Sequence, residues 1–235
     1  MRGNQRLVST VVVALLLLKP ALMLADTTNL NVGQTINLGA VITNNLSIQI
    51  GDKVFGGFYF AYNDYGASDI DLGASNVTVK ALENNIGFGL EFDEPLSALN
   101  TKTKDVTFRY TAEVAAGYNN LISDIDLKIT GSKGGAGTGT VSEVAFSDAF
   151  GGTAVGHADA FLTSQLEKLT VLDSTEVKLW VEKDVHVSGN SGGPTSFASI
   201  SAVQQTYSQV PEPSTALLVG LGLLGVVAVK RKRKS

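Results

Sequence analysis

The chain of 235 residues contains no cysteine. This absence excludes disulfide scaffolds, cysteine-ligated zinc and iron–sulfur sites, and cysteine nucleophiles. A protein without disulfides has to depend on its hydrophobic core for stability. The roughly 180 residues between the two ends are enough for such a core, because a domain of ~150 residues buries about 70% of its unfolded surface.

Basic residues are scarce in the middle of the chain. Ten of the 18 Lys and Arg residues, but all 22 Asp and Glu residues, lie between Asp26 and Val229, so this stretch has a formal charge of −12. A surface this acidic argues against nucleic acid and against anionic membrane surfaces as partners. It is typical of a soluble extracytoplasmic surface and points to no particular substrate.

The first 25 residues have the order of a secretory signal peptide. Arg2 and Arg6 precede an apolar run at 7–18, and the small residue Ala25 is followed by a polar segment. We therefore expect export through the secretion machinery and cleavage by signal peptidase after Ala25. Met23 stands where such sites usually have a small residue, so a retained N-terminal anchor is the alternative.

The other end of the chain combines a short apolar run with a basic cluster. Thr215 to Val229 is a stretch of 15 residues without a charge. As a helix it would extend about 22 Å, which is less than the ~30 Å of a bilayer core. The basic cluster that follows extends this reach by snorkelling and stays on the cytoplasmic side. It consists of Lys230, Arg231, Lys232, Arg233 and Lys234. The pattern predicts one short transmembrane helix in the inner membrane, with the body of the protein outside.

A proline-rich motif precedes this apolar run. Val210, Pro211, Glu212 and Pro213 stand directly before Ser214, and the two prolines favour an extended, protease-accessible segment. Motif, apolar run and basic cluster together resemble a PEP-CTERM sorting domain. The resemblance implies recognition by an exosortase, a membrane-embedded cysteine protease or transpeptidase-like enzyme of Gram-negative bacteria. It further implies removal of the tail and delivery of the body to the cell surface or the exopolysaccharide matrix. An ordinary C-terminal anchor is the alternative.

Between the two ends, apolar and polar residues alternate with a period of two. In the segment 105–114, DVTFRYTAEV, every second residue from Val106 to Val114 is apolar or alanine or tyrosine. Clean alternation indicates antiparallel strands with one face in water. Nine or ten such segments with short turns predict an all-β, antiparallel β-sandwich of jelly-roll type. The predicted organisation is a signal peptide at 1–25, a β-sandwich body at 26–209 and a sorting segment at 210–235. Only the segment 161–172 favours a helix, with a loop followed by a strand as the alternative.

The pentapeptide SDIDL occurs twice and brings paired carboxylates to one face of a predicted strand. These carboxylates belong to Asp69 and Asp71 in the first copy and to Asp124 and Asp126 in the second. Clustered carboxylate oxygens suit Ca²⁺, although the spacing of an EF-hand loop is missing. The alternative is a solvated strand face, and no other cofactor is expected.

The single tryptophan, Trp180, alternates with apolar neighbours and falls on the charged face of its predicted strand. An exposed indole is a surface on which a pyranose ring can stack. Tyr62 lies in an aromatic segment, 57–65, that would supply a further ring. These two residues are the candidates for a sugar-binding surface, and a Trp packed at the edge of the core is the alternative.

The sequence thus predicts an exported, non-catalytic protein of the cell surface or exopolysaccharide matrix, with an exosortase-like processing partner. The first alternative is a carbohydrate-binding module acting on extracellular polysaccharide, and the second is a glycoside hydrolase. No Gly-x-Ser-x-Gly motif or phosphate-binding loop is present, and no residue is nominated as catalytic.

Overall fold

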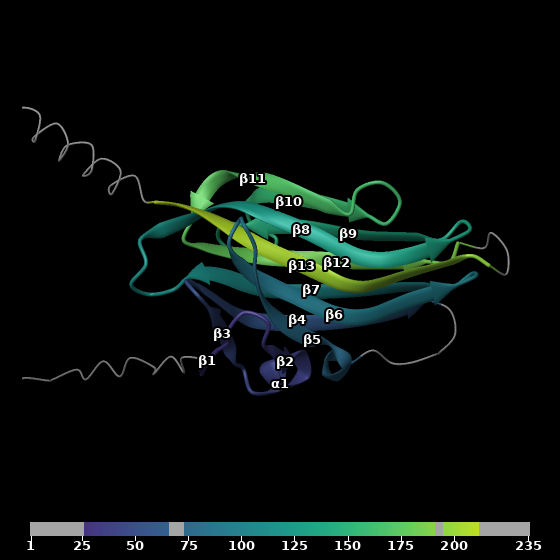
Figure 1. The fold of residues 1–235 in the computed structure, drawn as a ribbon, viewed down its shortest axis with the longest axis horizontal. Coiled ribbons are helices and arrows are strands. Elements are labelled where there is room, and N and C mark those ends of the chain that lie inside the picture. The colour runs from purple at the N-terminus through teal and green to yellow at the C-terminus, as the bar shows by residue number, and fades with distance from the viewer. Residues whose placement is uncertain (1–25, 66–72, 191–194, 212–235) are drawn as a thin grey trace, which may run out of the picture.

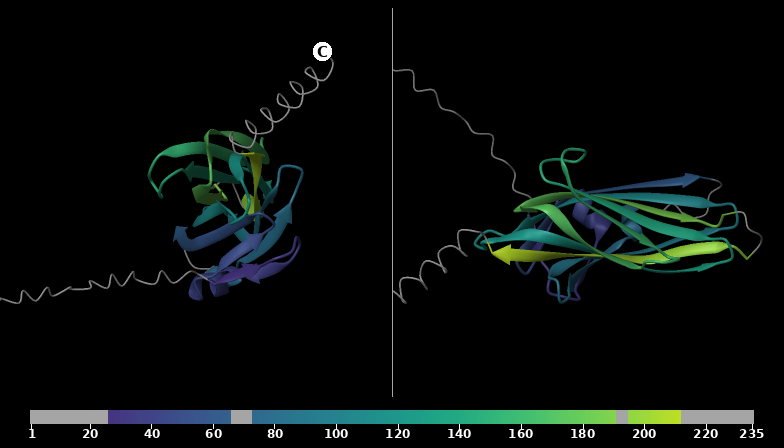
Figure 2. Two further views of the ribbon diagram at one scale, coloured as in Figure 1. Left: turned by 90° about the vertical axis from the view of Figure 1, so that its left-hand side faces the viewer. Right: turned by 90° about the horizontal axis from the view of Figure 1, so that it is seen from above.

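The computed structural model describes residues 26–65, 73–190 and 195–211. In these residues the chain forms two β-sheets stacked on each other, which confirms the predicted all-β sandwich (Figures 1 and 2). Neighbouring strands are antiparallel except for one parallel pair, β1 and β3. The long strands run along the longest axis of the molecule, so that most turns gather at its two ends (Figure 1).

The first sheet, sheet A, has seven strands, and its central members are the longest. In spatial order they are β1 (Thr27–Asn29), β3 (Ser47–Ile50), β4 (Lys53–Tyr65), β7 (Thr103–Val114), β12 (Lys178–Ser188), β9 (Thr138–Phe146) and β10 (Ala154–Phe161). The inward side chains of β7 and β12 are buried between the two sheets.

The second sheet, sheet B, has six strands. In spatial order they are β11 (Glu167–Glu176), β8 (Asn120–Gly134), β13 (Phe197–Pro211), β6 (Phe88–Leu99), β5 (Thr78–Glu83) and β2 (Thr35–Asn37). The last strand of the chain, β13, therefore lies inside sheet B, hydrogen-bonded to β6 on one side and to β8 on the other. Its position makes the C-terminal strand part of the centre of the fold.

Strand β7 shows the predicted alternation throughout its length. The residues expected to face inward, from Val106 through Phe108 and Tyr110 to Val114, are all buried, and their neighbours are partly exposed. Burial of one apolar face against the opposite sheet is what fixes the register of such a strand. The hydroxyls of Tyr110 and Tyr207 hydrogen-bond at 2.8 Å between the sheets, which satisfies both polar groups within the core.

In the described ranges, two short helical segments lie beside the sheets. Helix α1 (Leu38–Thr43) buries Leu38 and Val41, and its N-cap Asn37 accepts a hydrogen bond from the amide of Ala40 at 3.1 Å. The 3₁₀ turn η1 (Ala74–Asn76) is adjacent to it. The sequence did not predict α1, because six residues are too few to show helical periodicity.

The segment 161–172 is not helical. Strand β10 ends at Phe161, a turn follows, and β11 begins at Glu167, so the alternative of a loop and a strand is the correct one. The predicted signal peptide, 1–25, and the predicted transmembrane run, 215–229, lie outside the described residues. Within the described ranges, no helix combines the length and apolar character needed to cross a membrane.

Candidate functional site

The outer face of sheet A carries Trp180 together with an ion pair and further aromatic rings. Trp180 is half-buried between the buried residues Leu179 and Val181, as the predicted alternation requires. The ammonium of Lys178 lies 5.3 Å from the centre of its indole ring, a cation–π contact, and pairs with Glu113 at 3.0 Å. The indole is therefore fixed on the surface by its charged neighbour.

One step further along the same face, Arg109 lies between two exposed rings. Its guanidinium carbon is 5.6 Å from the ring centre of Tyr59 and 5.8 Å from that of Phe150. Its Nε donates to Glu182 at 2.7 Å. Tyr59 is 50% exposed and Phe150 37%, so their rings are accessible. We call this surface the aromatic face, and it consists of Tyr59, Arg109, Phe150, Trp180 and Glu182.

Tyr62 does not belong to the aromatic face. It pairs directly with Val106, whose side chain is buried, and Tyr62 itself packs against the core. Trp180 instead pairs with Thr111 on the opposite side of the sheet. The structure therefore places the two predicted sugar-stacking residues on different faces, and Tyr59 is an aromatic residue of β4 on the side of Trp180. A register shift in β4 between Gly56 and Tyr59 decides this, and the sequence pattern does not reveal it.

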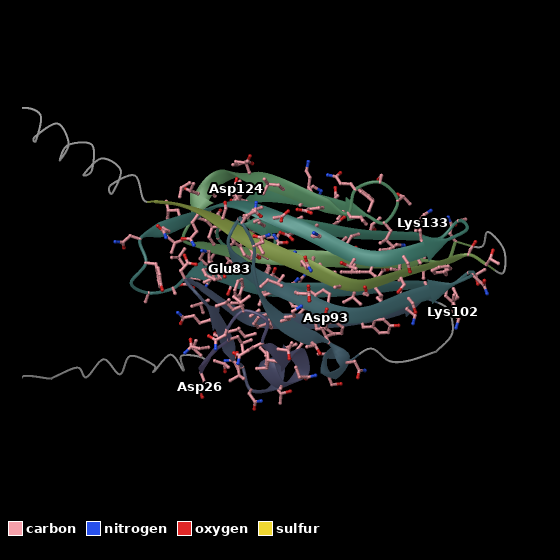
Figure 3. The ribbon with its side chains drawn as sticks, viewed as in Figure 1. Asp26, Glu83, Asp93, Lys102, Asp124 and Lys133 are labelled. Atoms are coloured by element: carbon pink, nitrogen blue, oxygen red, sulfur yellow. The ribbon has the colours of Figure 1, made fainter. Side chains whose placement is uncertain are left out.

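The outer face of sheet B is polar and holds Asp124 and Asp126. Asp124 accepts hydrogen bonds from the hydroxyls of Ser123, at 2.9 Å, and of Ser208. In Figure 3, Asp124 lies with Glu83 at the end of the sandwich where β13 finishes. Its carboxylate is thus engaged by one hydroxyl donor from its own strand β8 and one from the neighbouring strand β13.

Asp126 is only 3% exposed and lies in a hollow of about 90 Å³. The side-chain amide nitrogen of Asn84 lies 3.4 Å from Oδ2 of Asp126 and 3.0 Å from the hydroxyl of Thr206. The other carboxylate oxygen of Asp126, Oδ1, has no hydrogen-bond partner in the described part of the chain. Burial, and then the nearby charge of Glu167, raise the pKa of Asp126. The hollow is lined by Leu82, Glu83, Asn84, Asp126, Lys128, Gln204 and Thr206.

A buried glycine of β6, Gly89, lies beside this hollow. Gly89 pairs with Leu82 on one side and with Thr206 on the other, and both of these residues line the hollow. A Cβ atom at this position would stand 1.8 Å from the carbonyl oxygen of Gln205, which excludes any other residue without movement of β13. The hollow is much smaller than the ~300 Å³ at which ligand pockets begin.

The structure describes two of the four aspartates that the sequence suggested for calcium. Asp69 and Asp71 lie outside the described residues, and Asp124 and Asp126 have the separate hydrogen-bond partners given above. Among the residues placed in the structure, no three His, Cys, Asp or Glu side chains gather in a way that could hold a metal ion.

The end of β13 forms the junction with the C-terminal segment. Beyond Tyr207, which pairs with Phe88, β13 has lost its partner β6 and is held by β8 alone. Val210 pairs with Leu121 and Pro211 with Asn120. A proline is tolerated here because the strand end has one free side, where no N–H is required. Glu212, Pro213 and the basic cluster at 230–234 lie outside the described residues.

Residues 209–233 match the family model of the PEP-CTERM protein-sorting motif. The predicted resemblance is thereby confirmed. The PEP-CTERM motif implies export and processing by an exosortase at the membrane. Its first three residues, Gln209 to Pro211, are at the same time the last three residues of β13. In this chain the sorting segment therefore continues directly from a strand of the folded body.

Solved structures with similarity to the body in front of the PEP-CTERM segment include three carbohydrate-binding modules. One is TmCBM61 in complex with β-1,4-galactotriose, at 14% identity and a TM-score of 0.31, covering 65% of this chain and 89% of that one. Another is TmCBM27, described for specific mannan recognition, at 12% identity and a TM-score of 0.30, covering 67% and 99%. A third is the family 11 module from Clostridium thermocellum, at 10% identity and a TM-score of 0.23, covering 63% and 89%. TM-scores this low say nothing about a shared ligand. No curated protein matches the chain.

Proposed function

We propose that this protein is an exported, non-catalytic component of the cell surface or exopolysaccharide matrix of a Gram-negative bacterium, delivered through exosortase processing of its C-terminal segment. The observation that carries the proposal is the PEP-CTERM match at residues 209–233, which starts within the last strand of the sandwich. The precursor is held in the inner membrane by residues 215–229, with the body outside and the basic cluster in the cytoplasm.

The short distance between fold and membrane supports this role. Three residues, Glu212 to Ser214, separate the end of β13 from the apolar run that begins at Thr215. Fully extended, three residues reach about 10 Å. The precursor thus presents its motif to a membrane-embedded enzyme next to the end of the sandwich, and processing then frees the acidic body from the membrane.

The experiment is a comparison of cell fractions from the native host. Replacing Pro211-Glu212-Pro213 with three alanines is expected to leave the protein in the inner membrane, whereas the wild type reaches the surface or matrix. Pro194→Ala serves as the matched control, since it removes a proline outside the motif. Equal distribution of all three proteins would overturn the proposal and favour a plain membrane anchor.

A second candidate function is carbohydrate binding through the aromatic face. The observation that favours it is the exposure of Tyr59 and Phe150 on either side of Arg109, with Trp180 on the same sheet surface. Aromatic rings stack on sugar rings, while Arg109 and Glu182 supply hydrogen-bonding groups beside them. This arrangement suits the neutral or weakly charged sugars of an extracellular polysaccharide.

The test is co-sedimentation with exopolysaccharide from the native host. Trp180→Ala and Tyr59→Ala are each expected to reduce the bound fraction several-fold, because stacking on one ring contributes about 1 kcal/mol. Tyr118→Ala is the matched control, since Tyr118 is also 50% exposed but lies in the turn between β7 and β8. If the three variants bind like the wild type, the aromatic face has no role in polysaccharide binding.

The third candidate, a glycoside hydrolase, has the weakest support. Glu83 and Asp126 both line the hollow on sheet B, but a glycosidase needs two carboxyl groups about 5–9 Å apart across a groove that admits a sugar chain. The hollow of about 90 Å³ is too small for that. We expect no release of reducing ends when the protein is incubated with the polysaccharide, and such release would favour the enzyme.

A further inference from the structure

A cluster of three polar side chains is enclosed between the two sheets. It consists of Lys183 on β12, Glu143 on β9 and Gln205 on β13, each with 0% exposure. Lys183 and Glu143 are direct cross-strand partners in sheet A, and Gln205 reaches them from sheet B. We call these three residues the inner triad. Nothing in the proposed function uses them.

The Lys183 ammonium nitrogen contacts both other members of the inner triad. Its Nζ donates to Oε2 of Glu143 and, at 2.5 Å, to Oε1 of Gln205. A C=O bond is about 1.23 Å long, so the carbonyl carbon Cδ of Gln205 is at most about 3.7 Å from Nζ. Nucleophile and carbonyl carbon are therefore close to the ~3–3.5 Å separation of a near-attack arrangement.

The surroundings of the inner triad are apolar. Lys183 pairs with Phe108 on its other side, and Gln205 lies between Leu90 and Leu127, all of which are buried. This burial lowers the pKa of Lys183 well below its usual range. A proton passed from the ammonium to the Glu143 carboxylate leaves two neutral groups, which is the form favoured without water. Lys183 is then an amine with a free lone pair, the reactive form of a lysine nucleophile.

Two buried atoms of the inner triad have no hydrogen-bond partner among the described residues, namely Oε1 of Glu143 and Nε2 of Gln205. A buried polar atom that stays unpaired destabilises the folded state. An acyl transfer to Lys183 would remove one of them, because Nε2 is the leaving group. The unpaired oxygen of Glu143 would be the one available to exchange protons during that step.

We propose that Lys183 and Gln205 become joined by an intramolecular isopeptide bond, with Glu143 as the general acid and base. The Nζ lone pair attacks Cδ of Gln205, and the C=O electron pair moves to Oε1. Glu143 delivers its proton to Nε2 and takes one from Nζ. The carbonyl re-forms, the Cδ–Nε2 bond breaks, and ammonia leaves with that electron pair. One amine and one primary amide thus give one secondary amide and one ammonia, with Glu143 unchanged.

The bond would connect the two sheets through the strand that precedes the sorting segment. Lys183 belongs to sheet A, and Gln205 lies 22 residues later in β13 of sheet B. Because the chain has no cysteine, it has no disulfide to make such a connection. A covalent link would keep β13 in place while the C-terminal segment beyond it is held and processed at the membrane.

The test is mass spectrometry of the full-length protein, purified with detergent and digested with trypsin. The wild type is expected to be about 17 Da lighter than its sequence requires, the mass of one ammonia. It should also resist cleavage after Lys183, and fragmentation should place the loss on a Lys183–Gln205 link. Full sequence mass with normal cleavage after Lys183 would overturn the proposal. A loss of about 18 Da with a Lys183–Glu143 link would also overturn it, since Glu143 would then be the acyl group.

The variant Glu143→Gln tests the proton-transfer role while keeping the size and hydrogen-bonding capacity of the side chain. We expect it to have the full sequence mass and normal cleavage after Lys183. Glu91→Gln is the matched control on the outer face of sheet B, and it should lose ammonia as the wild type does. Loss of ammonia at the wild-type rate in Glu143→Gln would contradict the assignment of Glu143.

Discussion

In the part of the chain that the structure describes, a lysine, a glutamate and a glutamine meet twice, once on each face of β13. The inner triad is Lys183, Glu143 and Gln205, and the outer triad on sheet B is Lys80, Glu91 and Gln204. The two glutamines are consecutive residues, so the alternation of the strand sends one into the core and the other toward solvent. The same side-chain types therefore occur in two opposite environments.

The difference between the two triads shows how burial decides the chemistry. Lys80 is partly exposed, and its hydrogen bond to Glu91, at 2.8 Å, raises its pKa and keeps it charged. Burial has the opposite effect on the pKa of Lys183. For Glu91, burial alone would raise the pKa, but hydrogen bonds from Lys80 and Gln204 outweigh it and lower the pKa. The outer triad is an ion pair, whereas the inner triad has the properties of a nucleophile, an acid and an acyl group.

The largest difference in unfolding free energy between the two triads is expected when the lysine of each triad is replaced by alanine. Lys183→Ala leaves the buried Glu143 without its hydrogen-bond partner, which costs about 1–3 kcal/mol of unfolding free energy, in addition to the lost cross-link. Lys80→Ala breaks a partly exposed pair and costs about 1 kcal/mol or less. Urea unfolding of the two variants measures both values. Equal losses would show that burial does not separate the two triads.

The next largest difference is expected in the thermal unfolding midpoint when the glutamate of each triad is replaced by glutamine. Glu143→Gln is expected to prevent the Lys183–Gln205 bond, and closing a loop of 22 residues is worth about 3 kcal/mol by the chain-entropy estimate for cross-links. Thermal unfolding should shift downward by several degrees, roughly 2–4 °C for each kcal/mol. Glu91→Gln, which keeps the hydrogen bond to Lys80, should change the midpoint by no more than about 2 °C. A larger shift in Glu91→Gln than in Glu143→Gln would reverse the comparison.

The smallest change in folding stability is expected at two acids of the outer face of sheet B, Asp126 and Glu91, and it depends on pH. The pKa of Asp126 is raised in the folded protein, so its ionisation opposes folding above that pKa, and this cost is absent below the unfolded value of about 3.9. Asp126→Asn should therefore stabilise by about 1 kcal/mol at pH 7 and have no effect at pH 3.

Glu91 should show the opposite sign. Its pKa is lowered by folding, so its ionisation stabilises the protein above the unfolded value of about 4.3, and this contribution is lost as the pH falls. Glu91→Gln should thus destabilise slightly at pH 7 and have no effect at low pH. Unfolding midpoints of both variants between pH 3 and pH 8 test the two signs, and parallel curves would contradict the account.

The fold was largely predictable from the sequence because alternation is a local property. The pattern around Tyr110 identified β7 and its inward face, and the same rule put Trp180 on the outer face. The same alternation puts Lys183 on the inward side of β12 with Val181 and Val185, which is the sign of a buried lysine that the sequence offers. The position of Lys183 alone does not show that Glu143 and Gln205 lie beside it, so it does not indicate a reaction.

The sites depended on pairings between distant strands, which alternation does not give. Glu143 and Gln205 meet Lys183 only through the strand order of the two sheets. Tyr59 joins the aromatic face because β4 shifts register after Gly56, a feature with no simple sequence pattern. The sorting motif is the exception, since its order of residues is read directly from the chain.

The central claim is that the PEP-CTERM segment is processed so that the body leaves the membrane. The most direct measurement is the C-terminal sequence and intact mass of the protein recovered from the surface or matrix fraction of the native host. The account predicts a chain that lacks the basic cluster at 230–234 and ends near the motif that follows β13. Recovery of the surface protein with the complete C-terminus, ending in Lys234 and Ser235, would contradict it.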